Sequence, residues 1–121
     1  MIEVFSNVDY EYHPNILGHY VMTSEYVNGR NYYVSKSHKG NYGIWWDGSK
    51  NWIVGLSNLH KGKNLGYARL NKNTNAPINQ KNWMLYHGKR QGKHMWKKVV
   101  NDFGLRWSAG KIIYNFHRNQ L

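Results

Sequence analysis

The chain has 121 residues, enough for one domain built around one modest core. Its 17 Lys and Arg against 6 Asp and Glu give a formal net charge of +11, which favours nucleic acid, acidic lipid headgroups or acidic glycans as partners. The absence of cysteine excludes disulfides, thiolate zinc sites and a cysteine nucleophile.

Short aromatic and β-branched runs alternate with clusters of Gly, Asn, Ser and Lys, which is typical of a meandering antiparallel sheet. Closely spaced strands of this kind are expected to pair with their neighbours in sequence. In chain order, the runs predict strands at 19–25, 31–37, 42–46, 52–56, 66–70, 82–86, 94–99 and 111–117.

Three reversals carry recognisable turn chemistry. Asn28-Gly29 predicts a type I′ hairpin, because both central positions of that turn need positive φ. Lys39-Gly40-Asn41 and Asp47-Gly48-Ser49 mark two more turns.

The C-terminal third is harder to assign from its pattern. The apolar residues of 95–103 have spacings that a helix also accepts, and 112–116 fits either a buried strand or part of a core helix. We therefore predict one all-β domain over 1–121, a small antiparallel meander closing into a sandwich or a barrel-like domain, with room for one short C-terminal helix.

The N-terminal residues lack the basic start and long apolar core of a secretory signal. No stretch approaches the roughly 20 apolar residues of a membrane span. We expect a soluble chain, and the sequence leaves its compartment and its oligomeric state open.

A series of landmarks runs from Gly18 to Trp96. In order they are Gly18-x-Tyr20, Asn28-Gly29-Arg30-x-x-Tyr33-Val34, Tyr42-x-Ile44-Trp45-Trp46-Asp47-Gly48, Trp52-Ile53-Val54-Gly55, Gly66-Tyr67-Ala68, Pro77, Trp83 and Trp96. This order resembles a small aromatic-rich β module that recurs, often in tandem, in proteins of protists and marine invertebrates. The module usually has Pro where Asn31 stands, and 97–121 forms a C-terminal extension. The resemblance implies a compact β domain used for binding or display.

Aromatic side chains are the first candidates for ligand contact. They form a possible platform for stacking sugars or bases, which comprises Trp45, Trp46, Trp52, Tyr67, Trp83 and Trp96. Trp45 and Trp46 point to opposite faces of a regular strand, so one of them is expected near the surface if one face is solvated. For Trp52 and Trp83 we favour a place in the core.

Cations without compensating acids are the second candidates. The stretch 81–98 contains no carboxylate, and a continuous basic patch there would bind phosphates or sulfates in a salt-dependent way. A solvated hairpin that only maintains solubility is the alternative. The cations of this stretch are Lys81, Lys89, Arg90, Lys93, Lys97 and Lys98, with His87 and His94 between them.

Two further residues have both a binding and a structural interpretation. The guanidinium of Arg30 suits a carboxylate or sulfate, but it would equally hold its hairpin by stacking on Tyr32 or on a Trp. Asp47 would accept sugar hydroxyls beside an indole, although capping its own turn is the simpler role.

Recognisable catalytic and metal-binding patterns are missing from the sequence. The seven His residues show no H-x-H or H-E-x-x-H spacing, and the six carboxylates form no recognisable pair for glycoside hydrolysis. A metal-independent ribonuclease that uses His with Lys has no local signature and stays open below the binding interpretations. We therefore expect no enzyme, no metal and no cofactor.

The sequence as a whole predicts a lectin-like, carbohydrate-binding or polyanion-binding domain. Its expected ligand is a glycan or acidic polysaccharide, and nucleic acid or a role as an assembly module are the alternatives. The predicted ligand-binding residues are Arg30, Trp45, Trp46, Asp47, Tyr67, Lys89, Arg90, Lys93, Lys97 and Lys98.

Overall fold

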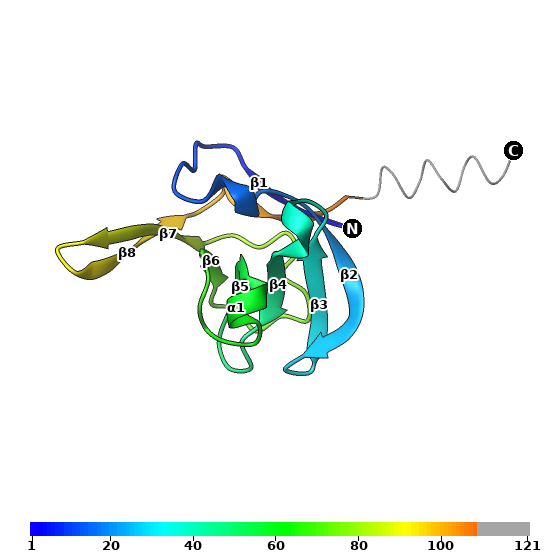
Figure 1. Ribbon diagram of the computed structural model, residues 1–121. Coiled ribbons are helices and arrows are strands. Elements are labelled where there is room, and N and C mark those ends of the chain that lie inside the picture. The colour runs from blue at the N-terminus through cyan, green and yellow to red at the C-terminus, as the bar shows by residue number, and fades with distance from the viewer. Residues whose placement is uncertain (109–121) are drawn as a thin grey trace, which may run out of the picture.

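The computed structural model describes residues 1–108, and in them antiparallel strands form a nearly closed, barrel-like sheet (Figure 1). The strands are β1 (Ile2–Ser6), β2 (Gly18–Val27), β3 (Arg30–Ser35), β4 (Tyr42–Trp46), β5 (Trp52–Leu56), β6 (Ala68–Leu70), β7 (Trp83–Arg90), β8 (Lys93–Val99) and β9 (Phe103–Trp107). Their order in the sheet, β8-β7-β6-β5-β4-β3-β2-β1-β9, confirms an all-β meander in which sequence neighbours pair.

Helical structure is limited to single turns in this part of the chain. They are η1 (Pro14–Ile16), η2 (His38–Gly40) and α1 (Ser57–His60). No helix among the described residues is long and apolar enough to cross a membrane.

The predicted turns form as their residues require. Asn28 and Gly29 have φ of 52° and 82°, so both central positions of the β2–β3 hairpin are left-handed, as a type I′ turn demands. Gly48, with φ of 90°, completes the turn between β4 and β5.

Two strands, β1 and β9, were not predicted. They pair with each other in antiparallel register, with Val4 opposite Leu105. The stretch 95–103, whose spacing also suits a helix, contains the end of β8, a turn and the first residue of β9. The predicted strand at 111–117 and the short C-terminal helix lie outside the described residues.

Strand β9 nearly closes the barrel against the chain that leads into β7. The backbone N–H of Asn79 donates to the carbonyl of Leu105 (2.8 Å), and that of Asn82 donates to Val100 (3.0 Å). Inside, the Phe103 ring meets the Trp83 ring edge-on at 5.7 Å between centroids. Trp52 and Trp83 are both buried in this core, as predicted.

Strands β4 and β5 are covered on both faces, and this overturns the expected exposure of an indole. Trp46 is 4% exposed and lies in the barrel core, whereas Trp45 is 0% exposed and lies on the other face with Val27 and Ile53. The loop after α1 covers that second face, because the carbonyl of Lys63 accepts a hydrogen bond from Trp45 Nε1 (2.8 Å). Neither indole presents a stacking surface.

Strands β7 and β8 continue beyond the barrel as a projecting hairpin, the arm (Figure 1). Its tip is a two-residue turn, Gln91-Gly92, with φ of 52° and 78°. The pairing shifts between Tyr86 and Lys89, which places a β-bulge where the arm leaves the body. The Tyr10 hydroxyl supports this base by donating to the carbonyl of Tyr86 (2.8 Å).

Candidate ligand-binding face of strands β6 to β8

The outward face of β6, β7 and β8 follows from strand alternation and register. Trp83 and Leu85 point into the core, so Met84 and Tyr86 point outward. Residues directly opposite each other share a face, and Met84 is paired with both Arg69 and Lys98. Tyr86 is paired with Trp96 on that same face.

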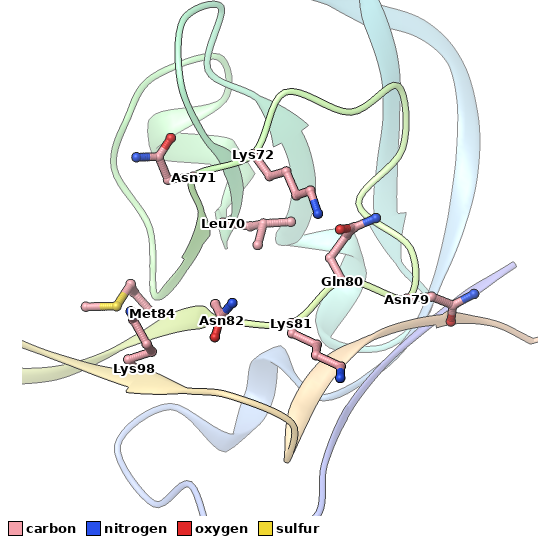
Figure 2. Close-up of a pocket in the computed structure, with 9 residues that line it drawn as sticks. All are labelled: Leu70, Asn71, Lys72, Asn79, Gln80, Lys81, Asn82, Met84 and Lys98. Atoms are coloured by element: carbon pink, nitrogen blue, oxygen red, sulfur yellow. The ribbon is translucent and has the colours of Figure 1, made fainter.

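A polar hollow of about 620 Å³ opens where β6 and β7 separate after a short stretch of pairing. Figure 2 shows Leu70 and Lys72 in the gap between the segment that ends β6 and the segment 79–84. We call this the amide hollow, and it is lined by Leu70, Asn71, Lys72, Asn79, Gln80, Lys81, Asn82, Met84 and Lys98.

The amide hollow combines hydrogen-bonding groups with positive charge. Four carboxamides supply both donors and acceptors, three ammonium groups supply charge, and no carboxylate lines the space. Within residues 1–108, the ion pairs join Lys61 to Glu25 and Arg106 to Glu3, so the lysines of the hollow stay unpaired. This composition suits a ligand that carries hydroxyls and acidic groups together.

A second space of about 340 Å³ lies on the other side of the Arg69–Met84 pair. Strands β6 to β8 contribute aromatic and cationic side chains to its walls. The segment from the end of β5 to the start of β6 contributes a mixture of apolar, polar and aromatic side chains. We call it the aromatic groove, and it is lined by Leu56, His60, Asn64, Leu65, Gly66, Tyr67, Arg69, Tyr86, His94 and Trp96.

The aromatic rings of this groove are held by their neighbours. The Tyr67 ring stacks on His13 at 3.5 Å between centroids, and the Tyr86 ring tilts against Trp96 at 5.2 Å. Tyr86 Oη and His94 Nδ1 lie 2.6 Å apart in a hydrogen bond. Burial raises the pKa of Tyr67, so its hydroxyl stays neutral, and burial lowers the pKa of His13.

The predicted site residues on the arm are exposed cations, but they divide between its two faces. Lys89 and Lys98 share the outward face with Trp96, because Lys89 is paired with His94 and Lys98 with Met84. Lys97 is paired with Leu85 on the opposite face, and Arg90 is paired with Lys93 beside the tip. Positive charge therefore lies on both faces of the arm.

Arg30 and Asp47 lie away from this face and hold loops in place. The Arg30 guanidinium sits 3.8 Å above the Trp46 ring and donates to the carbonyl of Thr74 and to Asn73 Oδ1. Asp47 Oδ1 accepts backbone hydrogen bonds from the three residues Ser49, Lys50 and Asn51 at 2.8–3.0 Å. These are the structural roles that sequence reasoning offered as alternatives.

The structure thus brings together Tyr67 and Lys98 on one face, with Lys89 further along the arm. It adds Arg69, Tyr86 and the amides of the hollow, none of which sequence reasoning named as site residues. The sequence does contain a signal for this shared outward face. Met84 and Tyr86 are two residues apart on one strand of the hairpin, and Trp96 and Lys98 are two residues apart on the other, so each pair points to one face of its strand.

The fold and this face define a class of protein: a barrel-like β domain with a basic arm and two open hollows on one side. No three His, Asp or Glu side chains within residues 1–108 are grouped so that they could hold a metal ion. Comparisons of the chain with protein-family models, curated proteins and solved structures found no match.

Proposed function

We propose that this protein is a non-enzymatic, lectin-like domain that binds an acidic polysaccharide along the outward face of β6 to β8. The amide hollow is the observation that carries the proposal. Its size, about 620 Å³, falls in the range of small-molecule sites, roughly 300–1,000 Å³.

The lining chemistry favours a sugar chain over a nucleic-acid backbone. A sugar hydroxyl both donates and accepts hydrogen bonds, and the carboxamides of Asn71, Asn79, Gln80 and Asn82 do the same. The sugar–phosphate backbone of DNA offers only acceptors to such groups, and that of RNA adds a single hydroxyl per nucleotide. The ammonium groups of Lys72, Lys81 and Lys98 match the carboxylates or sulfates of an acidic polysaccharide.

The test compares three ligands at two ionic strengths. Purified protein is titrated with an acidic oligosaccharide, a neutral oligosaccharide of equal length and a single-stranded oligonucleotide, at about 50 mM and 200 mM salt. We expect the acidic oligosaccharide to bind most tightly and to weaken as salt rises, because screening reduces charge contacts while amide–hydroxyl contacts persist.

A paired variant locates the binding. Asn71→Ala with Lys72→Ala removes one amide and one charge from the hollow, and we expect affinity for the acidic oligosaccharide to fall by about tenfold or more. Asn7→Ala with Lys50→Ala makes the same chemical change at exposed positions elsewhere and is expected to leave affinity unchanged.

Two results would overturn the proposal. Tighter binding of the oligonucleotide, at both ionic strengths, would assign the face to nucleic acid. Cleavage of an RNA oligonucleotide during incubation would contradict a non-enzymatic role, since His60 and His94 both line the adjacent groove.

A further inference from the structure

Within residues 1–108, two arginines lie over tryptophan rings, and they differ in what their N–H groups do. The guanidinium of Arg30 lies 3.8 Å from the Trp46 centroid, and that of Arg69 lies 4.1 Å from the Trp96 centroid. The N–H groups of Arg30 donate hydrogen bonds to the carbonyl of Thr74 and to Asn73 Oδ1. The guanidinium of Arg69, in contrast, makes no hydrogen bond or ion pair to any residue within 1–108.

The guanidinium of Arg69 is therefore held against an aromatic ring while its N–H groups remain available to a ligand. Contact with the Trp96 ring restricts the position of this guanidinium, which lowers the entropic cost of engaging a ligand. Five N–H donors in a planar fork match a carboxylate in two parallel hydrogen bonds. Since Arg69 lines the aromatic groove, a carboxylate bound there would have its attached ring inside the groove.

The groove also has surfaces for that ring. Tyr67 is backed by His13, and Tyr86 is held by its bond to His94, so two aromatic side chains are fixed before any ligand arrives. Trp96 is partly exposed beside them, and Asn64 adds a carboxamide on the facing wall. A volume of about 340 Å³, near the lower end for ligand sites, suits a single ring unit.

We propose that the aromatic groove is a subsite for one uronic acid residue, whose ring stacks on the aromatic wall while its carboxylate binds the fork of Arg69. The inference rests on the proposed function and names the acidic unit of the polysaccharide. The Arg69–Met84–Lys98 row separates the groove from the amide hollow on one face. Neighbouring units of the same chain then occupy the hollow.

Trp96 provides a direct optical probe of the groove. Among residues 1–108, the indoles of Trp45, Trp46, Trp52 and Trp83 are buried, and Trp107 is 52% exposed. In a Trp107→Phe protein, acrylamide quenching within this part of the chain reports mainly on Trp96. We expect an oligogalacturonate of defined length to reduce that quenching, whereas its carboxyl-reduced counterpart has little effect.

The decisive variant is Arg69→Lys, which keeps the charge and removes the planar fork. We expect it to weaken oligogalacturonate binding by about tenfold or more while leaving the carboxyl-reduced oligosaccharide unaffected. Arg106→Lys is the matched control, because Arg106 also stacks on an aromatic ring, Phe5, at 4.2 Å but lies on β9.

The outcomes separate this inference from the proposed function. If Arg69→Lys binds as the parent does while the Asn71/Lys72 variant binds weakly, the subsite is wrong and the hollow stands. If Arg69→Lys alone weakens binding, the uronate subsite stands and the hollow is wrong. Protection of Trp96 by a sulfated oligosaccharide but not by oligogalacturonate would overturn the uronate assignment, and protection by an oligonucleotide alone would overturn both proposals.

Discussion

Asp47 holds the turn between β4 and β5 through one carboxylate oxygen that accepts three backbone hydrogen bonds. Hydrogen bonds to a charged group are worth about 1.5–3 kcal/mol, and their loss leaves the backbone donors of the turn without a partner. We expect Asp47→Ala to lower the free energy of unfolding by about 1–3 kcal/mol at neutral pH. Urea unfolding followed by tryptophan fluorescence measures the change.

The pH dependence of this contribution has a definite sign. Burial of Asp47 opposes ionisation, but hydrogen bonds from Asn51, Ser49 and Lys50 outweigh it and hold its pKa below the ordinary value. Its stabilisation is fully present above the unfolded pKa and is lost as pH falls through the folded pKa. The stability gap between parent and Asp47→Asn should narrow on acidification. A gap that widens would contradict this, and Glu11→Gln, at an exposed carboxylate, is the control.

Gly66 allows the chain to approach β5 and thereby places Tyr67 in the aromatic groove. A Cβ at position 66 would collide with Ile53 Cγ2 and lie 2.8 Å from the carbonyl oxygen of Val54. We expect Gly66→Ala to destabilise the fold by about 1–3 kcal/mol, as overpacking does, measured by urea unfolding.

Gly104→Ala tests whether crowding is the cause of this cost. At position 104 an added Cβ meets its nearest neighbours at 3.5 Å, an ordinary contact distance, and the backbone there is not left-handed. We expect Gly104→Ala to lower the free energy of unfolding clearly less than Gly66→Ala does. Equal effects of the two substitutions would mean that close approach at Gly66 carries no special cost.

The two adjacent indoles show what a local pattern omits. Alternation correctly sends Trp45 and Trp46 to opposite faces of β4, but the expectation of an exposed ring assumed one solvated face. The covering loop reaches Trp45 through Lys63, which is 18 residues away in sequence. Nothing in the sequence of these two tryptophans indicates the loop that covers Trp45. The burial of both indoles therefore could not be predicted from the local pattern.

At the scale of elements, the arm concentrates exposed positive charge on a hairpin that projects from the barrel (Figure 1). Lys89, Lys93 and Lys97 are exposed on it. Converting all three to Gln should reduce the salt concentration that elutes the protein from immobilised heparin, because counterion release scales with the number of charge contacts. The melting temperature should stay nearly constant, since exposed side chains of this kind change stability by about 0.5 kcal/mol or less.

An equal loss of charge elsewhere distinguishes the arm from net charge. Lys39, Lys50 and Lys63 are exposed on other loops, and their conversion to Gln removes the same charge. We expect the control to elute close to the parent. Identical shifts for both triple variants would show that the arm has no particular role.

Strands β2 to β8 were predictable because each is bounded by turn residues and pairs with a sequence neighbour. Asn28-Gly29 fixed one hairpin, and 42–46 and 52–56 match β4 and β5 residue for residue. Strands β1 and β9 were not predicted, because they pair with each other although they are far apart in sequence, with Glu3 opposite Arg106. No local turn indicates such a partner. The amide hollow was not predicted either, because residues 71–72 and 79–82 come together only in the folded structure.

At the scale of the whole molecule, β9 links β1 to the chain that leads into β7 and so nearly closes the barrel, and Phe103 is the first residue of β9. Its ring is 1% exposed and packs edge-on against Trp83. Removing it by Phe103→Ala should cost about 3–5 kcal/mol, the usual loss for a buried aromatic ring. Phe5, on neighbouring β1, is only partly buried, so Phe5→Ala should cost clearly less.

The same variant tests whether the barrel unfolds as one unit. Because β9 pairs with β1 and also accepts a hydrogen bond from Asn79 in the chain before β7, detachment of β9 would remove contacts with both of these neighbours. We therefore expect far-UV circular dichroism and tryptophan fluorescence to give coincident urea transitions in the parent and in Phe103→Ala, with only the midpoint lowered. A fluorescence change that precedes the loss of strand signal would show that β9 detaches first and that the remaining strands fold independently of closure.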